Sequence, residues 1–155
     1  MFRKNRKEYP KHFLSRKTEV RESEIHGIGL FAVEAIEAHE LIEGCPVVIF
    51  HVDTKQYLED FFSQRHVLMD YPFYWSPGLL AFALGYGGLY NHSTYSPNAT
   101  WKVNREFDSL DFYSRHAIEP GEEILIRYLS IEKCNDGNLW FSDPTVPAIP
   151  LRAED

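Results

Sequence analysis

A glycine-rich, polar segment at the centre of the chain most constrains its fold. It spans residues 87–99 and reads Gly-Gly-Leu-Tyr-Asn-His-Ser-Thr-Tyr-Ser-Pro-Asn-Ala. An apolar run over residues 79–84 precedes it, so a buried element ends here in a tight loop. Glycine permits close backbone approach, and Asn91, Ser93 and Asn98 are suited to bonding the local backbone. Loops of this kind often hold ligands, although this segment taken alone is most simply an ordinary turn.

The rest of the chain predicts a β-rich fold. Apolar and polar residues alternate over residues 18–22, 100–104 and 110–114, and turn-forming residues separate such stretches. Residues 54–69 alone have clear helical spacing, and we expect their large apolar side chains in the core. These side chains are Tyr57, Leu58, Phe61 and Phe62. Many short strands and one main helix predict a mainly β, α+β fold of several small sheets.

A proline interrupts one of the apolar stretches. Two buried strands are predicted at Leu41–Glu43 and Val47–Phe50, with Gly44 and Pro46 between them. Proline cannot donate a hydrogen bond to a sheet ladder. We therefore expect Pro46 at the start of a strand or at a bulge.

Length and composition place the chain among ordinary globular proteins. Its 155 residues predict one domain, and a hydrophobic content of 44% predicts a packed core. It has no apolar run of membrane-spanning length and no recognisable signal peptide. The cysteines, Cys45 and Cys134, are isolated and match no zinc pattern, so we expect no metal. The simplest location is the cytoplasm, with the nucleus as an alternative in a eukaryote.

Charge divides the chain into a basic start and an acidic body. Residues 1–21 carry eight basic and two acidic side chains, a net +6, whereas the remainder carries a net −13. We expect a flexible basic arm over residues 1–17. An acidic body disfavours direct nucleic-acid binding, which needs cations for phosphates, and suits a cationic, lysine-bearing partner. Solubility alone is the alternative explanation for the acidic excess.

Two further motifs flank the central segment. Residues 27–30 read Gly-Ile-Gly-Leu, and residues 120–128 read Pro-Gly-Glu-Glu-Ile-Leu-Ile-Arg-Tyr. In this order the three motifs resemble those of the SET-domain protein-lysine methyltransferases, over about residues 18–128. The resemblance implies short curved sheets around a knot-like threaded core. It also implies methyl transfer from S-adenosylmethionine to the side-chain amine of lysine in a protein.

The same resemblance implies where the cofactor binds. The first motif would cradle the methionine part of S-adenosylmethionine through its backbone, since its glycines carry no side chain. On residues alone, this motif is most simply a strand-connecting turn, and phosphate binding is disfavoured because no Gly-Lys-Ser/Thr follows. Many relatives have an arginine shortly before the Asn-His pair, where this chain has Gly88-Leu89-Tyr90. The implied cofactor-binding residues are Gly27, Ile28, Gly29, Leu30, Asn91 and His92.

Tyr128 corresponds to the family's catalytic tyrosine, whose hydroxyl would orient the methyl group and the incoming amine. Considered alone, Tyr128 is a tyrosine at the end of a core strand. Relatives often have aspartate immediately before this tyrosine, where this chain has Arg127, and the cysteine-rich zinc segment that many relatives carry is absent. We expect four residues to line a substrate channel: Tyr74, Ile126, Trp140 and Phe141. Core packing is an equal alternative for Tyr74, and capping of the core is an equal alternative for Trp140 and Phe141.

These features predict a catalytic domain over residues 18–141 and a flexible, proline-containing tail over residues 142–155. The predicted function is protein-lysine methylation with a basic protein as substrate and no membrane partner. Two alternatives stay open: a non-catalytic module that binds lysine-bearing peptides, and a methyltransferase for a small amine or another non-lysine acceptor. The identity of the substrate and the number of methyl groups added are not encoded in any motif.

Overall fold

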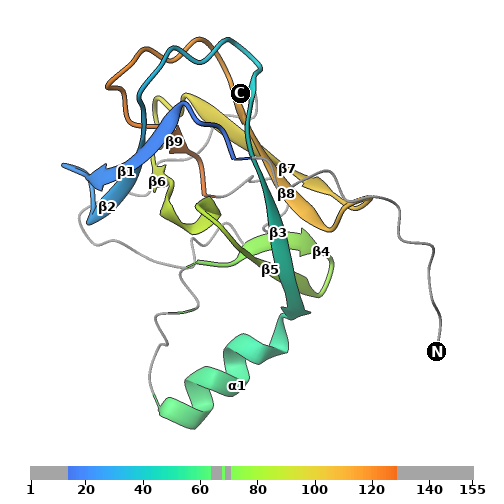
Figure 1. Cartoon of the computed structure of the whole chain (residues 1–155). Coiled ribbons are helices and arrows are strands. Elements are labelled where there is room, and N and C mark those ends of the chain that lie inside the picture. Colours follow the sequence, from blue (N-terminus) through green and yellow to red (C-terminus); the bar gives the residue numbers. More distant parts are fainter. Residues whose placement is uncertain (1–13, 64–67, 69–70, 129–155) are drawn as a thin grey trace.

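The computed structural model describes residues 14–63, 68 and 71–128, and its architecture is mainly β, as predicted (Figure 1). In chain order, the elements are β1 (Thr18–Glu22), β2 (Ile28–Ala32), β3 (Leu41–His51), α1 (Asp53–Phe62), β4 (Phe73–Ser76), β5 (Leu79–Ala83), the 3₁₀ helix η2 (Gly87–Leu89), β6 (Asn91–His92), β7 (Ala99–Asn104), β8 (Ser109–Ser114) and β9 (Leu125–Ile126). Short strands separated by turns account for most of this part of the chain, in agreement with the alternating pattern.

The strands form three sheets. β1 pairs with β2, β6 pairs with β9, and the remaining strands form a five-stranded sheet in the order β4-β5-β3-β8-β7. β3 is the centre of that larger sheet because it pairs with β8 along its first half and with β5 along its second half. The central and late motifs therefore meet in a small sheet of their own, set beside the larger one.

Pro46 lies inside a strand, which differs from the prediction. The two expected strands are one continuous β3, and the bulge in its pairing with β8 lies between Leu41 and Glu43. Pro46 is the last residue of β3 opposite β8, and Val47 is the first opposite β5. A missing N–H is tolerated at this change of partner, and the Pro46 carbonyl still accepts from the Leu84 N–H at 2.8 Å.

The core lies between β2, the five-stranded sheet and the segment that contains β9. Aromatic contacts link its parts: the Phe112 ring stacks on Tyr90 at 4.5 Å and meets Phe73 edge-on at 5.8 Å. Each large apolar side chain buried here contributes on the order of 1.5–3 kcal/mol to folding. The large aliphatic side chains that are fully buried among the described residues are Leu30, Ile36, Ile42, Leu110, Ile118, Ile124 and Ile126.

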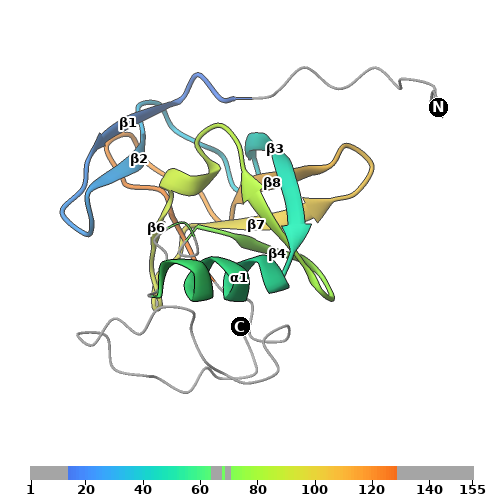
Figure 2. The same cartoon turned by 90° about the horizontal axis from the view of Figure 1, so that it is seen from below.

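α1 is shorter and more exposed than the sequence predicts. It ends at Phe62, because Ser63 adopts a left-handed conformation (φ 54°), whereas the pattern predicts a helix to residue 69. Its aromatic side chains are not in the core. Tyr57 and Phe61 are 69% and 70% exposed, and their rings stack on each other with centroids 6.5 Å apart. Figure 1 shows α1 at one end of the molecule, beyond the sheets, and in Figure 2, which is seen from that end, α1 lies in front of the strands. The helical spacing of these aromatic residues therefore marks a face of α1 that the described residues leave largely exposed.

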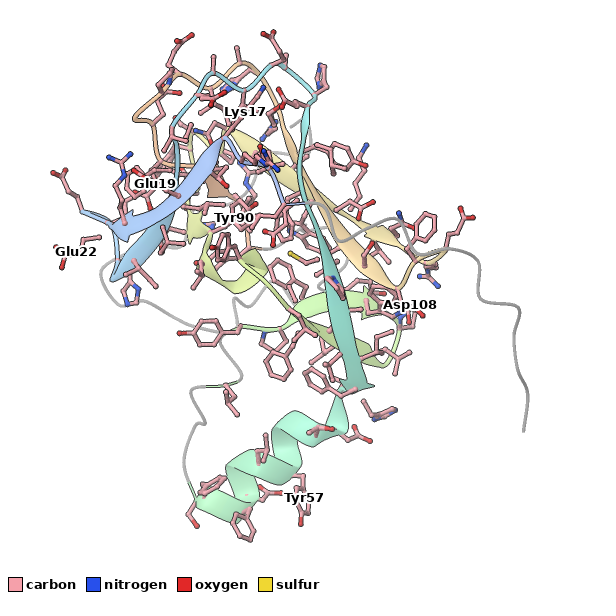
Figure 3. The ribbon with its side chains drawn as sticks, viewed as in Figure 1. Lys17, Glu19, Glu22, Tyr57, Tyr90 and Asp108 are labelled. Carbon is pink, nitrogen blue, oxygen red and sulfur yellow. The ribbon has the colours of Figure 1, made fainter. Side chains whose placement is uncertain are left out.

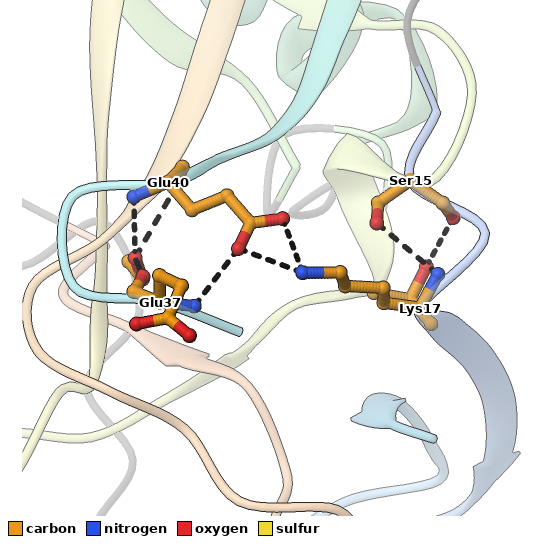
Figure 4. A network of polar contacts seen from close by, with 6 residues as sticks. Ser15, Lys17, Glu37 and Glu40 are labelled. Carbon is orange, nitrogen blue, oxygen red and sulfur yellow. Dashed lines mark hydrogen bonds and ion pairs between the residues drawn. The ribbon is translucent and has the colours of Figure 1, made fainter. Parts of the chain in front are cut away.

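Residues 14–17 are bonded to the domain, although the sequence places them in the basic arm. The Ser15 N–H donates to the Ile42 carbonyl at 3.0 Å. The Lys17 ammonium lies 2.8 Å from the Glu40 carboxylate, which also accepts from the Glu37 N–H (Figure 4). The ion pair lowers the pKa of Glu40. The anchored chain therefore begins by residue 14, and residues 1–13 lie outside the described part.

Among the described residues, no helix is both long and apolar enough to cross a membrane. The predicted boundary at residue 141 and the tail that follows it lie outside the described residues. The residues that carry the three motifs are all described, and their arrangement defines the candidate site.

Candidate active site

Parallel pairing of β6 with β9 brings the central and late motifs together. Asn91 lies opposite Leu125, and His92 lies opposite Ile126. The Asn98 side chain reinforces this pairing: its amide donates to the Glu123 carbonyl at 2.8 Å, and its oxygen accepts from the Leu125 N–H at 2.7 Å. Two motifs separated in the sequence thus form one rigid unit.

The Asn91 side chain connects this unit to the first motif. It is only 5% exposed, and its amide nitrogen lies within hydrogen-bonding distance of three acceptors. These are the carbonyls of His26 at 3.1 Å and Ile28 at 3.2 Å, and the Glu123 carboxylate at 2.7 Å. All three sequence motifs therefore converge on a single amide group.

Glu123 is a site residue that the sequence analysis missed. Its carboxylate accepts from Asn91 and also from the Ser23 hydroxyl at 2.9 Å, so it ties the loop before β2 to β6. The alternation that directs Ile124 and Ile126 into the core directs Glu123 to the opposite side, toward the first motif. The Gly-Glu-Glu motif contains both candidate glutamates. Only the isolated bridge between Glu123 and Phe31 of β2 shows which of them faces the first motif.

The two glycines of the first motif have different roles. A Cβ atom on Gly29 would collide with the Glu123 carboxylate and lie 2.9 Å from the Asn91 amide nitrogen. Gly27 adopts a left-handed conformation (φ 51°), and a Cβ atom there would meet nothing within 4 Å. Gly29 therefore permits close packing, whereas Gly27 leaves open space beside backbone carbonyls. The open space at Gly27 leaves room for the amino-acid end of S-adenosylmethionine, and cofactor binding by this motif stays a prediction.

The Tyr128 hydroxyl is held close to the same unit. It donates to the Tyr90 carbonyl at 2.8 Å, and the Tyr128 N–H donates to Nδ1 of His92 at 3.2 Å. Burial, with further contributions from Tyr71 and Glu123, raises the pKa of Tyr128 to about 12. The hydroxyl is therefore protonated at neutral pH and acts as a fixed dipole.

His92 is held as a neutral imidazole. Because Nδ1 accepts from the Tyr128 N–H, the ring proton lies on Nε2, which donates to the Thr94 hydroxyl at 2.9 Å. Burial and the positive charge of Arg127 lower the pKa of His92. A charged His92 would lose its acceptor nitrogen, so the neutral form maintains the backbone position of Tyr128.

Arg127 replaces the aspartate that relatives often have, and it makes a different set of contacts. Its Nη2 donates to the Thr94 carbonyl at 2.8 Å, and its own carbonyl accepts from the Trp101 indole at 3.4 Å. These contacts join the end of the central segment to the residue before Tyr128. Arg127 therefore connects Thr94 and Trp101 to the residue that precedes Tyr128.

Two of the four predicted channel residues, Tyr74 and Ile126, lie in the described part of the chain. Tyr74 is half-buried on β4, and Ile126 is wholly buried in the core, so a channel role for either stays a prediction. Trp140 and Phe141 lie outside the described residues. The structure instead brings Tyr71, 48% exposed, close to Gly88 and to Tyr128. Tyr71 is one tyrosine in an aromatic-rich stretch, so the sequence did not indicate that it lies here.

The described residues contain no cluster of three or more His, Cys, Asp or Glu side chains suited to a metal ion. Cys45 is buried, and burial beside Glu43 raises the pKa of its thiol, which disfavours the thiolate that metals bind. Cys134 lies outside the described part, so the predicted absence of a metal stays a prediction.

This site and fold define a SET domain. The SET-domain family model matches residues 27–129, and the chain belongs to that family. Enzymes of the family transfer the methyl group of S-adenosylmethionine, and the chain is a protein-lysine N-methyltransferase. It is 35% identical over 125 residues to the Schizosaccharomyces pombe "Histone-lysine N-methyltransferase, H3 lysine-37 specific", covering 81% of this chain and 77% of that protein. It also resembles a crystal structure of a candidate histone methyltransferase from Plasmodium falciparum, with a TM-score of 0.59 and 29% identity, covering 75% of this chain and 96% of that one.

Proposed function

We propose that the chain binds S-adenosylmethionine between its first and central motifs and methylates a lysine in a basic, histone-like protein. The observation that carries this proposal is the convergence of all three motifs on Asn91, next to the Tyr128 hydroxyl. The cofactor would be held by Gly27, Ile28, Gly29, Leu30, Asn91 and His92. When bound, it supplies an electrophilic methyl group on a sulfonium centre.

The protein's own contribution to catalysis is alignment. The Tyr128 hydroxyl is neutral and directed by the Tyr90 carbonyl, so its oxygen offers a fixed lone pair to the reacting groups. The lysine amine must be deprotonated to react, which costs about 4–5 kcal/mol at neutral pH for an unperturbed lysine. Burial lowers that cost, because an apolar setting disfavours the ammonium ion.

The charge of the domain supports a basic substrate. Residues 22–155 carry a net charge of −13, which attracts cationic partners and repels nucleic acid. The curated relative is described as acting on histone H3, whose chemistry fits that charge. We therefore propose a lysine in a basic histone segment as the acceptor, recognised partly through long-range attraction.

A labelled-cofactor assay tests this proposal directly. The full chain is incubated with S-adenosylmethionine carrying a labelled methyl group and with core histones, an acidic protein of similar size, or small primary amines. Label should appear on histone lysines and decline as salt screens the attraction. Cofactor binding without any transfer would favour a peptide-binding module, and label on small amines alone would favour a different acceptor.

Asn91→Ala provides the control for the site. It removes the amide that joins the three motifs, and we expect weaker S-adenosylmethionine binding by calorimetry and loss of label. Ser109→Ala is the matched variant, because Ser109 is also buried but bonds Asp111 on β8, away from the motifs. Equal cofactor affinity in both variants would contradict the proposed cofactor site.

A further inference from the structure

Glu43 is a buried carboxylate to which the proposed mechanism gives no role. It lies in β3, is 4% exposed and is surrounded by the core. A charged group survives such burial only with good partners. Its Oε1 accepts from the Tyr86 N–H at 2.9 Å, and its Oε2 accepts from the Tyr90 hydroxyl at 3.4 Å. Burial raises the pKa of Glu43, and these hydrogen bonds oppose that rise.

These contacts hold both ends of one short segment. Tyr86 and Tyr90 flank η2, so the two oxygens of a single carboxylate fix the segment at its start and its end. The backbone approaches so closely that a Cβ atom on Gly85 would lie 2.6 Å from Oε1 of Glu43. Gly85 also has a left-handed conformation (φ 82°), which favours glycine. The segment is therefore shaped around Glu43.

The far end of this segment belongs to the candidate active site. The Tyr90 carbonyl accepts from the Tyr128 hydroxyl at 2.8 Å, and the next residue is Asn91. The Tyr90 ring is stacked on the Phe112 ring with an interplanar angle of 4°, so the position of Tyr90 is closely fixed. Figure 3 shows Tyr90 in the interior of the molecule. A shift of Tyr90 would move the acceptor that orients Tyr128.

We propose that Glu43 is a positioning residue for methyl transfer: through Tyr86 and Tyr90 it fixes the carbonyl that directs the Tyr128 hydroxyl. It does not touch the reacting atoms, and its effect is on alignment. This inference rests on the proposed role of Tyr128. A buried group that serves stability alone would not affect kcat in the folded protein. A positioning residue would affect kcat, because misalignment by about 1 Å lowers the rate of the chemical step.

Two substitutions of similar size separate geometry from stability. Glu43→Leu removes every hydrogen bond and should lower kcat by about tenfold or more, with KM for S-adenosylmethionine changed far less. Glu43→Gln keeps the contacts, since its oxygen accepts from the Tyr86 N–H while its amide donates to the Tyr90 hydroxyl oxygen. It should therefore restore most of kcat. Both are measured at a temperature where circular dichroism shows a fully folded protein.

A double-mutant cycle tests the connection through Tyr90. Tyr90→Phe removes only the hydroxyl and should lower kcat by about threefold or more, with no further loss when added to Glu43→Leu. Where Glu43→Leu does not fold, the kcat of Tyr90→Phe alone still tests the inference. The control is Ser109→Ala, which removes another buried hydrogen bond on β8 and should lower the melting temperature without changing kcat.

Wild-type kcat in folded Glu43→Leu, wild-type kcat in Tyr90→Phe, or full additivity of the two would overturn the inference. Tyr128→Phe separates it from the proposed function. Wild-type turnover in Tyr128→Phe would remove the proposed role of Tyr128 and the present inference together. Reduced turnover in Tyr128→Phe with normal turnover in Glu43→Leu would overturn only the role of Glu43.

Discussion

At the scale of single residues, His92 makes the site sensitive to acid. Its pKa is below the ordinary 6.5 because the imidazole is buried and lies near Arg127. Above pH 6.5 the ring is neutral in the folded and unfolded chains alike. As the pH falls below 6.5, the unfolded chain takes up the proton first, so the free energy of unfolding decreases. At lower pH the folded ring is protonated as well, and the Tyr128 N–H loses its acceptor.

His92→Phe tests this linkage, because phenylalanine keeps an aromatic ring that does not titrate. Between pH 7.5 and pH 5.5, the melting temperature of the wild type should fall more than that of the variant, by a difference on the order of a few °C. The other six histidines are identical in the two proteins, so the difference isolates His92. An equal fall in both proteins would show that His92 is not linked to stability.

The two glycines of the first motif predict a contrast between two identical substitutions. Gly27→Ala should cost only the strain of a left-handed alanine, roughly 1–2 kcal/mol, because its Cβ atom meets nothing. Gly29→Ala should cost more and weaken S-adenosylmethionine binding, because its Cβ atom displaces the Glu123 carboxylate from Asn91. Chemical denaturation and calorimetry measure the two effects. Equal losses in the two variants would contradict the assigned packing role of Gly29.

The sequence singled out the residues of the motifs but not the residues that support them. Asn91 and Tyr128 were found because their motifs keep a recognisable order and spacing. Glu123 and Glu43 were not singled out, because their roles depend on contacts with residues distant in the chain. Local pattern shows that a residue is polar and that its neighbours are apolar, but it does not show which backbone groups will surround it. Such residues become visible only with the fold.

At the scale of elements, α1 shows why amphipathic spacing does not determine burial. Its start at Asp53 lies one residue before the predicted start at residue 54, and its aromatic residues follow helical spacing. The sequence does not show whether another element covers that face, and in the described part of the chain Tyr57 and Phe61 stay largely exposed. The strand pattern was more reliable, because alternation also reports which face is buried, as in β8.

Phe61→Ser and Phe112→Ala should therefore have very different effects on stability. Phe61 is largely exposed, so its replacement should change the free energy of unfolding by no more than about 0.5 kcal/mol. Phe112 is fully buried and contacts Tyr90 and Phe73, so its truncation should cost about 3–5 kcal/mol. Urea denaturation of both variants measures the difference. A large loss in Phe61→Ser would show that α1 is covered in solution.

At the scale of the whole molecule, the fold is maintained by a continuous core and by polar contacts between distant segments. The five-stranded sheet and its aromatic contacts supply the core without any disulfide or metal site among the described residues. A domain of this length buries enough apolar surface to be stable alone. The predicted independence from metal follows from this arrangement and from the absence of a zinc-ligand pattern in the sequence.

Treatment with a strong chelator should change neither the melting temperature nor the methyl-transfer rate. A structural zinc site normally uses four Cys or His ligands, and its loss would unfold the part it supports. Elemental analysis of the purified protein should find zinc far below one equivalent. Stoichiometric zinc, removed together with activity, would contradict the prediction and direct attention to residues outside the described part.

The bonds from Asn91 to the carbonyls of His26 and Ile28 join residues 65 and 63 positions apart. Pulse-labelled hydrogen exchange during refolding should show amides of the β7–β8 hairpin protected before those of β6 and β9, because short loops close at lower entropic cost than long ones. Simultaneous protection would argue against that order.

Late closure also means that a chain emerging from the ribosome acquires its catalytic geometry only after Ile126 has been synthesised. Until then, β6 has no strand to pair with, and the incomplete chain cannot catalyse methyl transfer.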